Sequence, residues 1–162
     1  MNQDENLRYL RDQSDIKDVI HRFVSEADKR SVEGMARCVS DDAVISYNDG
    51  AVVTRGISEL RTYMTNQFAP DGTLNPETRG THAMCNSIVT LDGDRAMAET
   101  SGVTYLATPA GKLYVRGVRY ADRFSRIDGV WKLVERLHSC GWQMDATAQV
   151  SPPNLNVPPE PA

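Results

Sequence analysis

The chain is 162 residues long, with a mass of 18.0 kDa, a formal charge of −4 and a pI near 5.3. This length predicts a single domain. A content of 40% hydrophobic and 25% charged residues is typical of a globular chain and excludes intrinsic disorder as the overall class. An acidic chain without a block of Lys and Arg is not expected to bind nucleic acid, because such proteins need a basic face to neutralise phosphates.

Targeting and membrane signals are missing from the sequence pattern. The polar, acidic segment 1–13 is not typical of a signal or transit peptide. No apolar run approaches the roughly 20 residues that span a bilayer, so no membrane partner is expected. The three cysteines, Cys38, Cys85 and Cys140, lack CxxC spacing, and their odd number does not favour a disulfide framework. We interpret them as reduced thiols of a cytoplasmic protein.

The first half of the chain alternates between helical and strand-like patterns. A helix is predicted over about 16–27, with Leu7 and Leu10 extending it backwards and Ser14 as a candidate cap. Its apolar stripe comprises Ile16, Val19, Ile20, Phe23, Val24 and Ala27. A short helix is predicted at about 31–39, followed by a hairpin of 43–49 and 51–55 closed by a type I′ turn at Asp49-Gly50. Segment 56–68 returns to helical spacing, and the Pro- and Gly-containing loop 69–77 is a candidate lid.

From residue 78 onward the pattern is almost continuous strand. Stretches 81–93, 95–108, 111–127 and 130–144 are separated by Gly-containing turns, which predicts an antiparallel meander. Strands of this length must curl, and the helices must cover the concave face. The predicted fold class is therefore α+β, a cone of N-terminal helices packed in a strongly curved antiparallel sheet over residues 1–145. Residues 146–162 are predicted to form a Pro-rich arm.

Three side chains from different elements are candidates for one catalytic group. Asp28 follows Val24 by one helical turn, and a carboxylate at the core boundary needs a partner. The simpler interpretation, a helix-end Asp paired with Arg30 or with the loop after it, is favoured by the sequence alone. His82 is predicted to share a strand face with Met84 and Ile88. If Asp28 accepts from one ring nitrogen, the tautomer is fixed and the other nitrogen can act as a base.

Tyr47 is the third candidate, because it shares a strand face with Ala43 and Ile45. It would donate to a substrate oxygen as negative charge develops, although core tyrosines without such a role are common. The predicted substrate-binding residues around these three are Phe23, Tyr63, Met84, Tyr105, Tyr120, His138 and Trp142. Arg116 and Arg119 lie on opposite faces of one strand, so at most one can face a cavity. The chain has no HExxH, GxGxxG, P-loop or GxSxG pattern, so no metal or organic cofactor is expected.

At these residues the chain resembles the SnoaL-like branch of the nuclear transport factor 2-like superfamily, including scytalone dehydratase, the bile-acid 7α-dehydratase and hexachlorocyclohexane dehydrochlorinase. The resemblance is carried by segments 27–30, 46–50, 80–82 and 127–133. It implies that Asp28 orients a catalytic His82 and that Tyr47 assists. Two departures concern the leaving group. Phe23 stands where relatives have a helix tyrosine or lysine, and Ile127 lies near the place of the dehydrochlorinase's strand arginine.

The resemblance implies a cofactor-independent lyase with a small hydrophobic, aromatic or polycyclic substrate. Dehydratase-like elimination and deformylating carbon–carbon cleavage would use nearly the same groups. The alternatives are an isomerase or cyclase, in which the proton returns to the substrate, and a non-catalytic ligand-binding or association module. A homodimer or homotrimer through the strands after Gly111 is expected.

Overall fold

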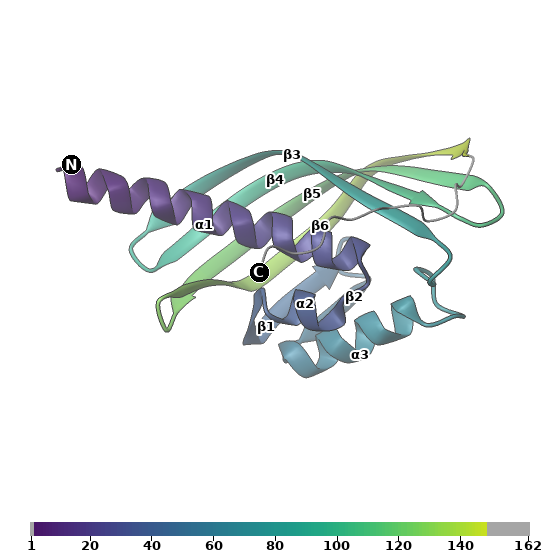
Figure 1. Cartoon of the computed structure of the whole chain (residues 1–162), viewed down its shortest axis with the longest axis horizontal. Helices are drawn as coiled ribbons and strands as arrows, with labels where there is room; N and C mark the ends of the chain where they lie inside the picture. The colour runs from purple at the N-terminus through teal and green to yellow at the C-terminus, as the bar shows by residue number, and fades with distance from the viewer. Residues whose placement is uncertain (1, 149–162) are drawn as a thin grey trace, which may run out of the picture.

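The computed structural model describes residues 2–148 and has an α+β architecture (Figure 1). One six-stranded sheet in the order β2-β1-β6-β5-β4-β3 is packed against the N-terminal helices. The elements are α1 (Gln3–Asp28), α2 (Val32–Ala36), β1 (Val39–Tyr47), β2 (Val52–Arg55), α3 (Gly56–Phe68), β3 (Arg79–Asp92), β4 (Arg95–Ala107), β5 (Lys112–Ile127) and β6 (Val130–Thr147). The predicted class and the helix-on-curved-sheet arrangement are confirmed.

The sheet is mixed rather than wholly antiparallel. Strands β3 to β6 form the predicted antiparallel meander, and β2 pairs antiparallel with β1. However, β1 runs parallel to β6. The chain crosses from β2 through α3 to β3 at the far edge of the sheet, which leaves the free edge of β6 for β1 to pair with. The expectation of a purely antiparallel sheet is wrong at this one pair.

The turn between β1 and β2 differs from the predicted type I′ turn. Tyr47 pairs with Val52, so the connection has four residues, 48–51, instead of two. Asn48, Asp49 and Gly50 all have positive φ, at 51°, 56° and 90°. Asn and Gly tolerate this left-handed conformation. A type I′ turn requires positive φ only at its two central residues, whereas this turn has three such residues in a row. The backbone N–H of Asp49 donates to the carbonyl of His138 (3.0 Å), which ties the turn to β6.

Helix α1 starts at Gln3, so it includes the predicted backward extension through Leu7 and Leu10, and Ser14 lies within the helix rather than at its cap. Asn2 and Glu5 form a capping box, in which each side chain accepts from the other's backbone N–H at 2.9 and 2.7 Å. The first turns extend past the β3–β4 turn (Figure 1), and Leu7 and Leu10 are accordingly exposed. This local cap, rather than burial, is what allows the helix to begin so early.

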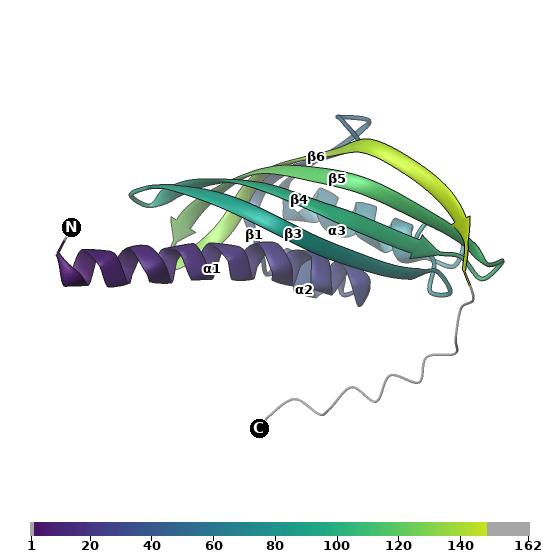
Figure 2. The same cartoon turned by 90° about the horizontal axis from the view of Figure 1, so that it is seen from above.

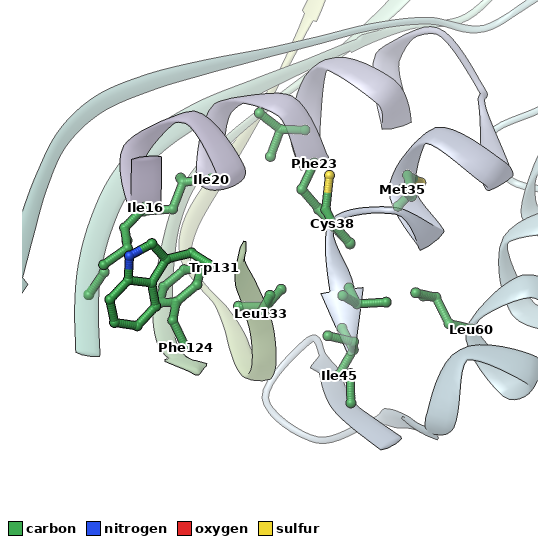
Figure 3. Close-up of a cluster of buried hydrophobic side chains, with 14 of the residues drawn as sticks. Ile16, Ile20, Phe23, Met35, Cys38, Ile45, Leu60, Phe124, Trp131 and Leu133 are labelled. Atoms are coloured by element: carbon green, nitrogen blue, oxygen red, sulfur yellow. The ribbon is translucent and has the colours of Figure 1, made fainter. Parts of the chain in front are cut away.

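The core lies between the concave face of the sheet and the three helices. Figure 2 shows the long strands arching over α1, and Figure 3 shows the side chains packed between them. This cluster contains Ile16, Ile20, Phe23, Met35, Cys38, Ile45, Leu60, Phe124, Trp131 and Leu133. The β4 residues facing it are small, such as Ala96 and Ala98, which leaves room for the helix.

Three β-bulges interrupt the regular alternation of the long strands. The pairing shifts between Met84 and Asn86 in β3, between Leu133 and Glu135 in β6, and between Cys140 and Trp142 in β6. Each extra residue moves the following side chains to the opposite face of the sheet. Ile88 consequently points away from the face that carries His82 and is 66% exposed, so the prediction that they share a face is wrong.

The end of the sheet lies beyond the predicted domain boundary. Strand β6 continues to Thr147, past residue 145. Most of the Pro-rich arm predicted for 146–162 lies outside the described residues. In the described part of the chain, no helix combines the length and apolar character needed to cross a membrane.

Candidate active site

Asp28 and His82 form a two-point contact between the end of α1 and the start of β3. The Asp28 Oδ1 atom lies 2.6 Å from His82 Nδ1, and its Oδ2 accepts from the His82 backbone N–H at 2.8 Å. Because a carboxylate accepts, Nδ1 carries the proton and Nε2 keeps its lone pair. The side chains are 20% and 24% exposed, so the pair is shielded yet reachable from the cavity described below.

The surroundings of this pair explain how the carboxylate reaches the strand. A Cβ atom at Gly80 would lie 3.3 Å from Asp28 Oδ1, so a glycine here permits the close approach. The simpler interpretation expected Arg30 to pair with the Asp28 carboxylate, but Arg30 does not do so. Its guanidinium instead donates to the backbone carbonyl of Asp28 and to carbonyls of the loop 69–78, including Asn75 and Thr78. Both carboxylate oxygens of Asp28 are therefore left for His82.

A cavity of about 170 Å³ lies between α1, α3 and the sheet. Among the predicted site residues, Phe23, Tyr47, Tyr63, His82, Tyr120 and His138 line it. Asp28 lies behind His82, outside the lining. Leu74 from the loop 69–77 also lines it, in agreement with the expectation of a loop beside the site.

Three predicted wall residues do not line the cavity. Tyr105 faces outward on β4 and is 39% exposed, while its neighbour Thr104 faces inward. Trp142 follows the second bulge of β6, so its side chain lies on the outer face over Gly117 and is 53% exposed. Met84 faces inward but packs against the core and over Gly102. Strand phase turns Tyr105 and Trp142 away from the cavity, whereas Met84 has the inward phase but lies outside the lining.

Arg136 is a cavity residue that the sequence analysis missed. Simple alternation from Trp131 and Leu133 would turn Glu135 inward, but the bulge after Leu133 turns Arg136 inward instead. Its side chain is 1% exposed and donates to both oxygens of Asp122 at 2.8 and 2.7 Å. The guanidinium carbon lies 4.7 Å from the Phe23 ring centre and 4.5 Å from that of Tyr120.

Several hydrogen-bond donors of the cavity remain available. The Arg136 Nη1 atom and the Tyr47 hydroxyl are buried, and no group in residues 2–148 forms a hydrogen bond with either. Burial raises the pKa of Tyr47 far above its usual range and raises the pKa of Tyr120 to about 12, so both phenols stay protonated. Buried polar groups are normally satisfied, so unpaired donors at a cavity wall are suited to a ligand oxygen.

His138 adds a neutral donor. Its Nδ1 lies 3.2 Å from the backbone N–H of Asn48, which can donate but not accept, so Nδ1 is the acceptor and Nε2 carries the proton. The ring lies beside Tyr120 at 5.2 Å and Tyr47 at 6.4 Å between ring centres. Burial, followed by the charges of Arg136 and His82, lowers the pKa of His138 to about 4. The imidazole is therefore uncharged near neutral pH.

The lowered pKa of His138 predicts a pH-dependent loss of stability. In the unfolded chain a histidine takes up a proton near pH 6.5, whereas folded His138 does so near pH 4. Between these values the unfolded state binds more protons, so the free energy of unfolding must fall as the pH falls. Arg136, Arg116 and His82 oppose protonation, and Asp49 favours it. Urea denaturation should show that the free energy of unfolding falls less between about pH 7 and about pH 5 in His138→Gln than in the wild type. An equal fall in both proteins would contradict this prediction.

Metal ligands do not gather in the part of the chain that the structure describes. No three His, Cys, Asp or Glu side chains of residues 2–148 lie close enough together to hold a metal ion. The side chains named above supply one oriented imidazole base and several neutral or cationic donors.

Comparison with known proteins agrees with this architecture. The SnoaL-like domain family matches residues 8–137. A putative scytalone dehydratase from Novosphingobium aromaticivorans is 16% identical over 94% of this chain and 97% of its own, with a TM-score of 0.73. The hexachlorocyclohexane dehydrochlorinase LinA-type3 from Novosphingobium barchaimii is 18% identical over 91% of this chain and 99% of its own, with a TM-score of 0.78.

A third structure, the protein of unknown function Rv3472 from Mycobacterium tuberculosis, is 25% identical over 85% of this chain and 73% of its own, with a TM-score of 0.67. No curated protein sequence matches the chain. The family match and the shared fold confirm the predicted resemblance and the predicted nuclear transport factor 2-like α+β cone.

Proposed function

We propose that this chain, which belongs to the SnoaL-like domain family, is a cofactor-independent lyase acting on a small hydrophobic or aromatic molecule. The observation that carries the proposal is the 2.6 Å contact between Asp28 and His82, with the imidazole at the wall of the cavity. A partly buried aspartate that fixes the tautomer of a histidine is an arrangement suited to general-base catalysis.

In the proposed reaction, His82 Nε2 removes a proton from a carbon beside a carbonyl or phenol. Asp28 stabilises the imidazolium that forms. The substrate oxygen gains negative charge, which the donors Tyr47, His138 and Arg136 Nη1 stabilise from the facing wall. The carbon–oxygen bond to a leaving hydroxyl then breaks. The proton held by His82 passes to the departing oxygen, so water leaves and the base is regenerated without an external reactant.

The size of the cavity limits the substrate. A volume of about 170 Å³ is below the roughly 300–1,000 Å³ of pockets for drug-sized ligands. It is close to an apolar cavity of about 150 Å³ known to bind benzene. A single-ring substrate therefore fits this cavity better than the polycyclic one that the resemblance also allowed.

Isomerisation remains the second candidate, because the same wall of donors would stabilise an enolate whose proton returns to another carbon. The direct test is to incubate the protein in D₂O with a panel of small cyclic ketones and phenols after dialysis against a chelator. Mass spectrometry should show His82-dependent exchange or loss of water. Deuterium gain without loss of water would support an isomerase, and release of formate a carbon–carbon lyase. If no compound of the panel exchanges deuterium, loses water or releases formate, a binding or association module is favoured.

We also propose that the outer face of the sheet is a contact between copies of this chain. Its strands expose large apolar side chains, namely Ile88, Met97, Tyr105, Leu137, Trp142 and Met144. Ile88, Met97 and Leu137 also line one hollow on this face. Contiguous apolar surface of this kind marks association sites.

Light scattering should accordingly return two or three times the 18.0 kDa mass of one chain. Leu137→Glu should shift the protein toward the single-chain mass, because a carboxylate placed in an apolar contact is costly to bury. Leu10→Glu is the matched control, since Leu10 is 62% exposed on α1 and away from the sheet's outer face. A wild-type mass of one chain at micromolar concentration would remove the proposed assembly.

A further inference from the structure

The charge of the cavity lining is unlike that of the whole chain. Two arginines and two histidines line the cavity, and none of its lining residues is Asp or Glu. This occurs in a chain with a formal charge of −4. The two neighbouring carboxylates are already occupied, because Asp28 accepts from His82 and Asp122 accepts from Arg136. A third carboxylate, Asp49, acts on the pKa of His138 but does not line the cavity, so no carboxylate of residues 2–148 is part of the lining.

Arg116 is the one lining cation whose charge has no matched partner in residues 2–148. Its Nε donates to the neutral amide oxygen of Gln143 at 2.8 Å, and no Asp or Glu of the described residues forms an ion pair with it. After burial and the charge of Arg136, the Arg116 charge is among the causes that lower the pKa of His138, so it acts on the cavity interior. Arg136, in contrast, is neutralised by Asp122.

The strand register places Arg116 in the same row of the sheet as the proposed base, His82, two strands away. His82 pairs with Thr104, and Thr104 pairs with Arg116, so the three lie in one row across β3, β4 and β5. Thr104, the middle residue, is buried and lines the cavity. Because neighbouring strands lie about 4.8 Å apart, the backbones of His82 and Arg116 are separated by about 10 Å. Their side chains can thus approach the two ends of one ring-sized molecule that lies over Thr104.

We propose that the cavity takes a single-ring substrate that carries a carboxylate, with Arg116 binding the carboxylate and His82 facing the opposite end of the ring. The inference rests on the proposed function for the role of His82, whereas the carboxylate contact itself does not. An Arg side chain suits this role because its planar fork matches the two oxygens of a carboxylate. Arg119 serves as the internal control, because it lies on the outer face of the same strand and is exposed.

The test compares two probes of nearly equal shape, 4-hydroxybenzoate and its neutral amide, 4-hydroxybenzamide. Ligand-observed NMR or calorimetry should show that the wild type binds the carboxylate about 10- to 100-fold more tightly, as expected for a charge-assisted contact. Arg116→Gln should remove most of this preference, Arg116→Lys should keep part of it, and Arg119→Gln should leave it unchanged. The preference should weaken in high salt, because Arg116 is partly exposed.

Equal affinity for both probes, no measurable binding of either, or the same loss in Arg119→Gln would overturn the inference. His82→Ala separates it from the proposed function, because this variant should keep the carboxylate preference while losing proton exchange. If the preference is found but no substrate exchanges a proton in the wild type, the proposed lyase fails and the carboxylate site stands.

Discussion

Replacing His82 by alanine is expected to lower proton exchange on a bound substrate by about 10²–10⁴-fold, the usual contribution of a positioned general base. The reason is geometric: Nε2 of His82 is the ring nitrogen left with a lone pair once Nδ1 donates to Asp28. Exchange measured in D₂O by mass spectrometry reports this step directly, whichever product follows. His21→Ala is the matched control, because His21 is exposed on the outer side of α1.

Asp28→Asn should also be severe although the side-chain shape is kept. An amide can present its N–H₂ group to Nδ1, which would favour the wrong tautomer, and it cannot stabilise the imidazolium. Circular dichroism and urea denaturation should show that both variants remain folded. Full exchange activity in His82→Ala on a verified substrate would rule out the proposed mechanism, whereas loss in His21→Ala would point to a general defect of folding.

The Asp28–His82 contact was implied by the family resemblance, whereas the sequence pattern alone favoured another partner for Asp28. The pattern could nevertheless place both side chains toward the core, because it is left undisturbed by the fold at these positions. The helical period of α1 places Asp28 one turn after the buried Val24, and the alternation of β3 holds from His82 to Met84. The first bulge comes after that point. Tyr47 was likewise placed correctly, since the alternation with Ala43 and Ile45 is regular up to the turn.

Tyr120 and His138 on the far wall of the cavity were among the predicted residues. Arg136 could not be predicted, because bulges depend on pairing between distant strands rather than on local sequence. Arg136 follows the first bulge in β6 and lies on the face opposite to the one that alternation from Leu133 gives. Trp142 follows the second bulge and lies on the face opposite to the one that alternation from Arg136 and His138 gives.

The prediction that Tyr105 lines the cavity did not hold for a different reason. Aromatic residues were expected inside, but on β4 the concave face carries small or polar side chains such as Ala98 and Thr104.

The second large effect is expected at Asp122, which lies on β5 and holds the Arg136 guanidinium. Asp122→Asn should lower the free energy of unfolding by about 3–5 kcal/mol, because removing one partner leaves the other charge buried and unpaired. Arg136 is 1% exposed and its partner 0% exposed, so water cannot replace the lost carboxylate. Since domains are stable by only about 5–15 kcal/mol, urea denaturation should register this as a large shift.

A neighbouring pair on the same two strands supplies the control. Arg123 and Glu135 lie 3.5 Å apart, but their side chains are 67% and 53% exposed. Glu135→Gln should therefore cost at most about 1 kcal/mol, the usual limit for a surface ion pair. An equal cost for Asp122→Asn and Glu135→Gln would contradict the assignment of Asp122–Arg136 as a buried, mutually dependent pair.

The double variant Asp122→Leu with Arg136→Met separates stability from function. Replacing a buried ion pair by apolar residues of similar volume is often neutral or stabilising, so this variant should fold about as stably as the wild type. It nevertheless removes the buried Nη1 donor that the proposed mechanism directs at the substrate oxygen. We therefore expect near-wild-type denaturation with proton exchange lowered by about 10²–10³-fold, the typical loss of one oxyanion donor. Normal exchange in a stable double variant would leave Arg136 as a purely structural residue.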